Sequence, residues 1–215
     1  MYHLLRGLYT ELTRQTEYSI LVIGLNGSGK TTFVEHAKEM YTGKPRYESG
    51  PTIGQNVVKL PVSNTILHFW DLGGSSEFTN LWDRYYGDAQ AVLFFIDGTD
   101  TQRLKESWEI FETLKTHSDL QGIPIVVCAT KQDKQGAMSA ADIEKKFIDY
   151  SNNTPNIPYT SLSSLSERLE NSHSHSNQHN DDKRNLILNL VNTDQSSIKS
   201  VIDALFVRVQ TSPRG

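Results

Sequence analysis

The stretch "YSILVIGLNGSGKTTFVEHAKEMY", residues 18–41, decides the fold of this chain. It begins with an apolar run of strand length over 18–25 and continues as a helical pattern over 29–41. Between them lies "GLNGSGKT", Gly24–Thr31, which fits the pattern G-x-x-x-x-G-K-[ST]. A glycine-rich turn between a strand and a helix is the context in which this pattern binds phosphate groups.

The residue types of this turn explain why it suits phosphate. Phosphate oxygens need several donors directed at one point, and positions without side chains let backbone N–H groups converge there. The N-terminus of the following helix adds its dipole, Lys30 reaches the terminal phosphates, and the Thr31 hydroxyl can bind Mg²⁺. A turn that matches this pattern by chance rarely lies between a strand and a helix. The predicted phosphate contacts come from Gly24, Asn26, Gly27, Ser28, Gly29, Lys30, Thr31 and Thr32.

Apolar runs and helical patterns alternate along most of the remaining chain. The runs at 91–97 and 123–130 do not alternate with polar residues, as is typical of buried parallel strands. Two further runs flank Asn64 and predict a hairpin. The sequence therefore predicts an α/β fold, with a sheet covered by helices on both faces. The predicted strands and helices are 18–25, 29–41, 56–63, 65–72, 91–97, 101–116, 123–130, 139–150, 157–162 and 196–210.

Two segments depart from this alternation. Residues 2–12 place leucines three and four positions apart, which predicts a one-sided helix within 1–15. Residues 166–195 are mostly polar and rich in histidine, serine and asparagine, which predicts a disordered insertion. We therefore expect an N-terminal amphipathic helix, 1–15, followed by one domain, 16–215, that carries this insertion.

Composition excludes several classes of protein. The chain has 215 residues and a net charge of −4, so no general attraction to nucleic acid is expected. A single cysteine, Cys128, rules out an internal disulfide and indicates a cytoplasmic protein. No apolar run approaches the ~20 residues that cross a bilayer. We expect a monomer.

A second motif, "TKQD" at 130–133, follows the predicted strand 123–130. Guanine presents N1–H and N2–H₂ side by side, and the Asp133 carboxylate can accept from both, whereas adenine has no such donor pair. The alkyl stem of Lys131 can cover one face of the ring. An isolated tetrapeptide of this kind is usually a solvated turn, but ligands of open α/β sheets collect at the carboxyl ends of strands.

Four motifs in order, "GLNGSGKTT", "PTIGQN", "WDLGGSSE" and "TKQD", resemble the Arf branch of the Ras-like small GTPases, and most closely its Arf-related group at the trans-Golgi. The resemblance covers 2–165 and 196–210. It implies the small-GTPase P-loop fold: a six-stranded, mostly parallel sheet with one antiparallel strand, flanking helices and an N-terminal helix. It also implies GTP or GDP and Mg²⁺ as ligands.

The resemblance assigns roles to particular residues. Thr52 matches the threonine that binds Mg²⁺ in the GTP state, so the implied metal ligands are Thr31 and Thr52. Asp71 matches the acid that holds Mg²⁺ through water, and Gly74 matches the glycine whose N–H meets the γ-phosphate. "SSLS" at 163–166 resembles the guanine loop. The alternative is a chance cluster of serines. The implied guanine-loop contacts are Ser163 and Ser164.

Ser75 stands where the family has the glutamine that orients the attacking water. Serine is shorter, so two interpretations remain. The protein is either a nearly hydrolysis-dead switch, in the extreme a pseudo-GTPase scaffold, or a GTPase whose partner supplies the missing group and an arginine finger. A P-loop nucleotide kinase would need a lid with several arginines, which are scattered here. The implied catalytic positions are Ser75, Lys30 and Thr52.

Other substitutions concern the guanine site and the partner surface. Thr130 replaces the usual asparagine, and Gln55 replaces an aromatic residue of the effector surface. Trp70 and Tyr85 match the other two aromatic residues there, although Trp70 can equally be a core residue. Trp82 and Tyr86 are predicted to be packing residues.

The implied biology is that of the Arf-related group. Tyr2 follows the initiator methionine, which excludes the N-myristoylation that ordinary Arf proteins carry. The resemblance implies reversible binding to Golgi membranes through the N-terminal helix and a membrane-protein receptor. It also implies an exchange factor, a GTPase-activating protein (GAP) and effectors as partners, with a role in protein recruitment and vesicle traffic.

Overall fold

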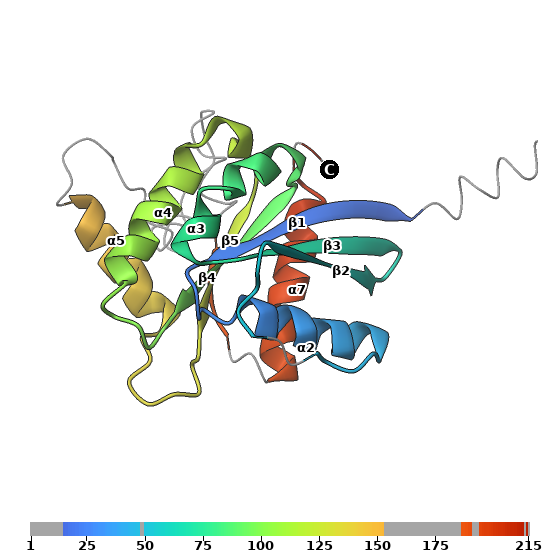
Figure 1. Ribbon diagram of the computed structural model, residues 1–215, viewed down its shortest axis with the longest axis horizontal. Helices are drawn as coiled ribbons and strands as arrows, with labels where there is room; N and C mark the ends of the chain where they lie inside the picture. Colours follow the sequence, from blue (N-terminus) through green and yellow to red (C-terminus); the bar gives the residue numbers. More distant parts are fainter. Residues whose placement is uncertain (1–14, 48–49, 153–185, 191–193, 213, 215) are drawn as a thin grey trace, which may run out of the picture.

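A six-stranded sheet forms the centre of the molecule, in the order β2-β3-β1-β4-β5-β6 (Figure 1). The structure is a computed structural model that describes residues 15–47, 50–152, 186–190, 194–212 and 214. Only the pair β2 and β3 is antiparallel. The strands are β1 (Thr16–Gly24), β2 (Gln55–Val62), β3 (Thr65–Leu72), β4 (Ala91–Asp97), β5 (Ile125–Thr130) and β6 (Leu186–Asn189).

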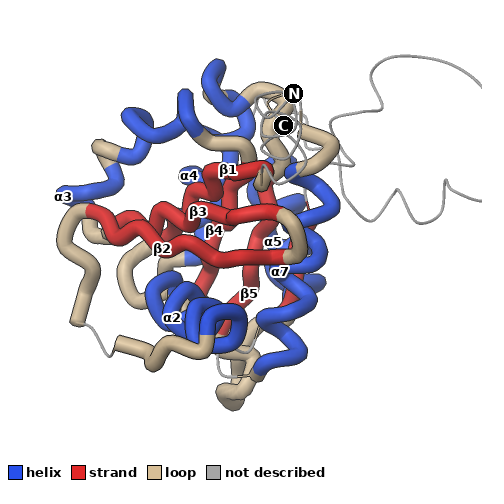
Figure 2. Tube along the Cα trace, turned by 90° about the vertical axis from the view of Figure 1, so that its right-hand side faces the viewer, coloured by secondary structure: helices blue, strands red, loops and turns tan. Residues whose placement is uncertain are grey.

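Helices cover both faces of this sheet, as Figures 1 and 2 show. The helices α2 and α7 pack on one face, and α4, α5 and the 3₁₀ helix η1 pack on the other. The central strands are buried on both sides, which explains their unbroken apolar runs. The helices are α2 (Lys30–Thr42), α3 (Ser76–Thr79), η1 (Trp82–Asp88), α4 (Leu104–Thr116), η2 (Ser118–Leu120), α5 (Ala140–Asn152) and α7 (Gln195–Val209).

The predicted pattern of the helix at 101–116 is confirmed. Leu104, Trp108, Phe111 and Leu114 lie at spacings of three and four, and all four are buried against the sheet. The β2–β3 hairpin is also confirmed, with Val62 opposite Thr65.

The sixth strand consists of residues that the sequence analysis assigned to the polar insertion. β6 runs parallel to β5, with Leu186 opposite Val126. β6 and the first residue of α7 lie at the C-terminal end of the predicted insertion at 166–195, and most of the other residues of that stretch lie outside those described. A run of only four residues cannot be distinguished from a loop without its partner strand.

Two predicted elements lie outside the described residues. These are the strand expected at 157–162 and, apart from Gln15, the N-terminal helix expected within 1–15. Among the residues that are described, no helix combines the length and the apolar character that a membrane span requires.

Candidate functional site

The glycine-rich loop connects β1 to α2 at the carboxyl edge of the sheet. Gly24, Gly27 and Gly29 have φ angles of 147°, 80° and 87°, a region that side chains disfavour. A Cβ on Gly24 would lie 2.3 Å from the carbonyl oxygen of Phe95 on the neighbouring strand β4. The loop can therefore take this shape only with glycine at these positions.

Lys30 is the first residue of α2, and its side chain is buried under the loop, with 6% of its surface exposed. The ammonium donates to the carbonyl oxygens of Gly24 at 2.9 Å and Leu25 at 3.0 Å. Burial lowers the pKa of Lys30 to about 8, although the nearby Asp71 carboxylate favours the charged form. A desolvated cation held by two neutral carbonyls is well placed to exchange them for an anion.

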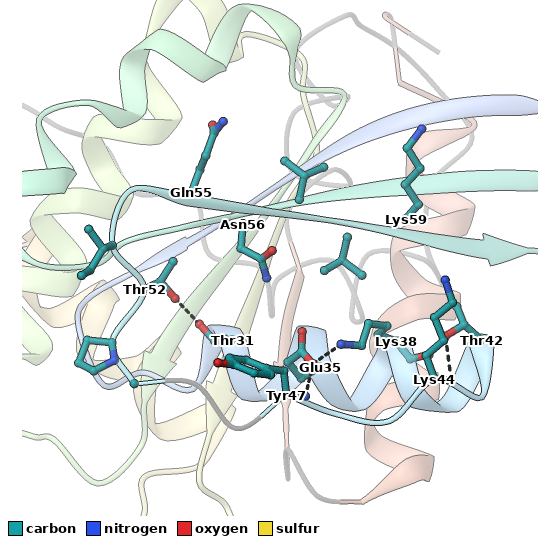
Figure 3. Close-up of a pocket in the computed structure, with 15 residues that line it drawn as sticks. Thr31, Glu35, Lys38, Thr42, Lys44, Tyr47, Thr52, Gln55, Asn56 and Lys59 are labelled. Carbon is teal, nitrogen blue, oxygen red and sulfur yellow. Dashed lines mark hydrogen bonds and ion pairs between the residues drawn. The ribbon is translucent and has the colours of Figure 1, made fainter.

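Two hydroxyls and a carboxylate converge beside Lys30. The Thr31 and Thr52 hydroxyl oxygens are 2.7 Å apart. Figure 3 shows the two side chains pointing toward each other. Asp71 is fully buried at the end of β3, and neither carboxylate oxygen has a hydrogen-bond partner among the described residues. Burial raises the pKa of Asp71 to about 6, while the Thr31 hydroxyl, the Lys30 ammonium and the Thr52 hydroxyl, which lie near the carboxylate without hydrogen-bond geometry, oppose that shift. An unpaired buried carboxylate beside two hydroxyls suits a hard cation such as Mg²⁺.

The loop that carries Thr52 lies across a groove of about 800 Å³ between α2 and β2 (Figure 3). Before Thr52 in the chain, the backbone N–H of Tyr47 donates to the Glu35 carboxylate of α2 at 2.7 Å. After Thr52, the carbonyl of Gly54 accepts from the N–H of Gly73 at 2.8 Å. Anchors on both sides thus hold Thr52 next to Thr31.

Gly74 lies directly against the glycine-rich loop. A Cβ on Gly74 would come within 2.4 Å of the Gly24 carbonyl oxygen and 2.6 Å of the Lys30 ammonium nitrogen. The indole N–H of Trp82, from η1, donates to the carbonyl of the preceding Gly73 at 3.0 Å. Trp82 is buried, as predicted, but its hydrogen bond to this segment could not be predicted from the sequence.

Ser75 occupies the position before α3 and is partly exposed, and its side chain does not cap that helix. It borders an open cleft of about 600 Å³ that also includes Asn26 and Arg103. Arg103 donates to the Asn26 carbonyl at 3.1 Å and pairs with Asp100 at 2.6 Å. Sequence reasoning missed Arg103, which only the fold brings to the loop.

Thr130 connects the second motif to the first. Its buried hydroxyl shares its one proton between the carbonyls of Ser28 at 3.0 Å and Ile96 at 3.1 Å. The end of β5 is thereby fixed to the glycine-rich loop and to β4. This contact shows what a threonine does at the position where an asparagine was expected.

Lys131 and Asp133 follow Thr130 at the same edge. Lys131 has a positive φ of 58°, and its ammonium lies 2.5 Å from the Asp97 carboxylate at the end of β4. Burial would raise the pKa of Asp97, but Lys131 and the N–H and hydroxyl of Thr99 outweigh it and hold that pKa below its ordinary value. Asp133 is exposed, with Lys134 at 3.2 Å. Asp97 was missed, although an acid at the end of a strand was a usable signal.

Other predicted residues lie elsewhere. Ser163 and Ser164 are outside the described residues. Trp70 and Tyr85 pack together with ring centroids 5.8 Å apart, next to exposed Gln55 on β2. Trp70 is partly buried against the α4 and α5 face, so it takes part in packing and still reaches the surface.

Comparison with known proteins shows the family of this chain. The model of the ADP-ribosylation factor (Arf) family matches residues 4–185. The chain is 42% identical over 153 residues to human ADP-ribosylation factor-related protein 1, covering 69% of this chain and 76% of that protein. It is 39% identical over 150 residues to ADP-ribosylation factor-like protein 3 of Saccharomyces cerevisiae, covering 68% and 76%.

A solved structure of the Arl6 BBS3 small GTPase of Trypanosoma brucei with bound nucleotide analogue GppNp superposes with a TM-score of 0.68. The superposition covers 92% of this chain and 99% of that chain. Because the sequence identity is 22%, the similarity shows the fold alone. Fold and glycine-rich loop together define a small GTPase. The chain belongs to the Arf family, whose members bind guanine nucleotides with Mg²⁺ and hydrolyse GTP.

The Thr130 bridge predicts a specific loss of stability. Thr130→Val keeps the shape of the side chain but leaves two buried carbonyls without their donor, which should lower the free energy of unfolding by about 1–3 kcal/mol. Thr113→Val is the matched control, because that hydroxyl bonds only a carbonyl of its own helix at an exposed position. Its effect should stay within about 0.5 kcal/mol. Urea unfolding of both variants measures the difference, and equal effects would contradict the bridge.

Proposed function

We propose that the chain is an Arf-like molecular switch that binds GTP through Gly24–Thr32 and responds to the terminal phosphate through Thr52 and Gly74. The observation that carries this proposal is the pair of hydroxyls 2.7 Å apart beside the unpaired carboxylate of Asp71. Two hydroxyls and a carboxylate gathered in this way suit a hard cation, which could also bind phosphate oxygens.

Each residue of the loop has a defined task in this proposal. The backbone N–H groups of Gly27–Thr32 surround the phosphates, and Lys30 exchanges the loop carbonyls for phosphate oxygens. Thr31 and Thr52 would hold Mg²⁺ directly, and Asp71 would hold it through water. When bound, Mg²⁺ neutralises negative charge on the β- and γ-phosphates.

Guanine recognition is proposed for the loop after β5. The Asp133 carboxylate accepts from the two adjacent donors of the base, and the stem of Lys131 covers the ring. Asp97 supports this by holding the Lys131 ammonium away from the ring face. Ser163 and Ser164 stay candidates for the remaining contact to the base.

Hydrolysis is proposed to be slow in the isolated protein. Ser75 borders the cleft beside Gly74, yet its hydroxyl ends two atoms short of a glutamine amide. A GAP that supplies a water-orienting group and an arginine finger would then control the rate. Without such a partner, the protein would act as a scaffold that retains GTP.

Action at Golgi membranes is the proposed cellular role, and its support is the similarity to Arf-related protein 1. Residues 1–15 are proposed to form an amphipathic helix that contacts the membrane together with a membrane-protein receptor. Reversible contact of this kind suits a switch that recruits other proteins through an exchange factor, a GAP and effectors.

The nucleotide content of the purified protein tests the function directly. We expect GDP or GTP to be released on denaturation and to be identified by chromatography. In competition experiments, Asp133→Ala should lose the preference for GTP over ATP, because it removes the acceptor for N1–H and N2–H₂. A protein that carries no nucleotide and binds neither GDP nor GTP with Mg²⁺ would overturn the proposal.

Ser75→Gln should accelerate single-turnover GTP hydrolysis about tenfold or more, at least with a GAP from cell extract, because it restores a side chain that can orient water. Ser76→Gln, one position further along at an exposed site, is the control and should have no effect. Rapid hydrolysis by the unmodified isolated protein would show that Ser75 is not limiting.

Deletion of residues 1–15 should abolish recruitment to Golgi membranes and make loading with GTP easier, because the proposed helix would no longer have to leave the domain. Localisation of a fluorescent fusion and nucleotide exchange rates measure the two effects. A truncated protein that still reached Golgi membranes would refute the role of this segment.

A further inference from the structure

Arg214, close to the C-terminus, makes an unusual set of contacts with backbone carbonyls. Its Nη1 shares two N–H groups among the carbonyl oxygens of Tyr86 at 3.0 Å, Gly87 at 2.9 Å and Ala89 at 3.3 Å. Its Nη2 donates to the carbonyl of Asp119, in η2, at 2.6 Å. The guanidinium is planar and carries several donors in a fixed fork, so it can satisfy acceptors from two separate segments at once.

The backbone of the same residue is held as well. The carbonyl of Arg214 accepts from the Gln90 side-chain amide at 2.8 Å, and the amide oxygen of Gln90 accepts from the N–H of Ser19 at 2.7 Å. Ser19 lies in β1, the strand that leads into the glycine-rich loop. The C-terminal tail is therefore tied both to the end of η1 and to the central strand.

The end of η1 is a site where a cation is favoured. The last carbonyls of a helix have no partner within it and carry partial negative charge. Short 3₁₀ helices have poor internal hydrogen-bond geometry, so the position of η1 depends strongly on what holds its ends. Arg214 supplies donors at one end.

The other end of η1 reaches the nucleotide site. Trp82, its first residue, donates its indole N–H to the Gly73 carbonyl at 3.0 Å. Gly74, the next residue, packs against Gly24 and Lys30, where an added Cβ would meet both within 3 Å. A continuous series of hydrogen bonds and packing contacts thus runs from Arg214 through η1 to the segment beside the glycine-rich loop.

We propose that Arg214 is a positioning residue for the nucleotide response, because it fixes η1 and thereby holds Gly73 and Gly74 in place for the terminal phosphate. This inference rests on the proposed function. GDP has no γ-phosphate for Gly74 to meet, so the loss of Arg214 should weaken the retention of GTP-like nucleotides and leave the retention of GDP nearly unchanged.

The test compares release rates of fluorescent GDP and of a fluorescent GppNp analogue from the full-length protein with Mg²⁺. Arg214→Ala should release the GppNp analogue about three to ten times faster, the size expected from losing about one net hydrogen bond. Release of GDP should change less than about twofold. Arg214→Lys keeps the charge without the fork and should give an intermediate rate.

Trp82→Phe and Arg84→Ala complete the design. Trp82→Phe removes the indole donor to Gly73 together with part of the buried ring volume, and it should also accelerate GppNp release, with no added effect when combined with Arg214→Ala. Arg84 is an exposed arginine on η1 itself, so Arg84→Ala controls for charge and should match the wild type. Hydrogen exchange of the η1 amides should rise in Arg214→Ala and stay unchanged in Arg84→Ala.

The outcomes separate the two proposals. A wild-type protein that retains neither nucleotide contradicts the proposed function. A wild-type protein that binds both nucleotides, with Arg214→Ala releasing GDP and GppNp equally faster or both unchanged, contradicts the role of Arg214, because a merely structural residue gives no difference between them. A larger effect on GppNp, shared non-additively with Trp82→Phe, supports it.

Discussion

The close approach of Gly74 to the glycine-rich loop is the contact on which the rest of the site depends. No side chain fits between Gly74 and its neighbours Gly24 and Lys30. The approach also requires β3 to lie beside β1, so that Asp71 at its end faces the start of α2. Parallel pairing of these strands brings two distant glycine-rich turns to the same edge of the sheet, the edge at which ligands of open α/β sheets bind.

Burial gives this site its electrostatic character. Lys30 and Asp71 are both removed from water. Burial lowers the pKa of Lys30 and raises the pKa of Asp71, so it favours the neutral form of each group. Each group is a charge that the protein alone solvates poorly, so a triphosphate with its cation would satisfy both at once. Binding energy of this kind can be used to draw the Thr52 loop and the Gly73–Gly74 segment inward, which is how a γ-phosphate operates a switch.

The scaffold around the site is fixed by contacts that span the whole chain. Thr130 joins β5 to the glycine-rich loop, Asp97 holds Lys131, and Arg214 joins the C-terminus to η1. Each is a polar side chain that satisfies a backbone carbonyl or a charge on a different element. Such contacts limit how far one loop can move without the others.

The fold class, the glycine-rich loop and the helix faces follow from the sequence, because strand and helix periodicity and a pattern with fixed spacing are local properties. The roles predicted for Thr52 and Gly74 come instead from the resemblance to the Arf branch, and they stay predictions. Which segment forms the sixth strand depends on the tertiary structure, because the four residues of β6 can be recognised as a strand only by their pairing with β5. The tertiary structure also decided the roles of Thr130, Asp97 and Arg214, because their partners lie 34 to 128 residues away in the chain.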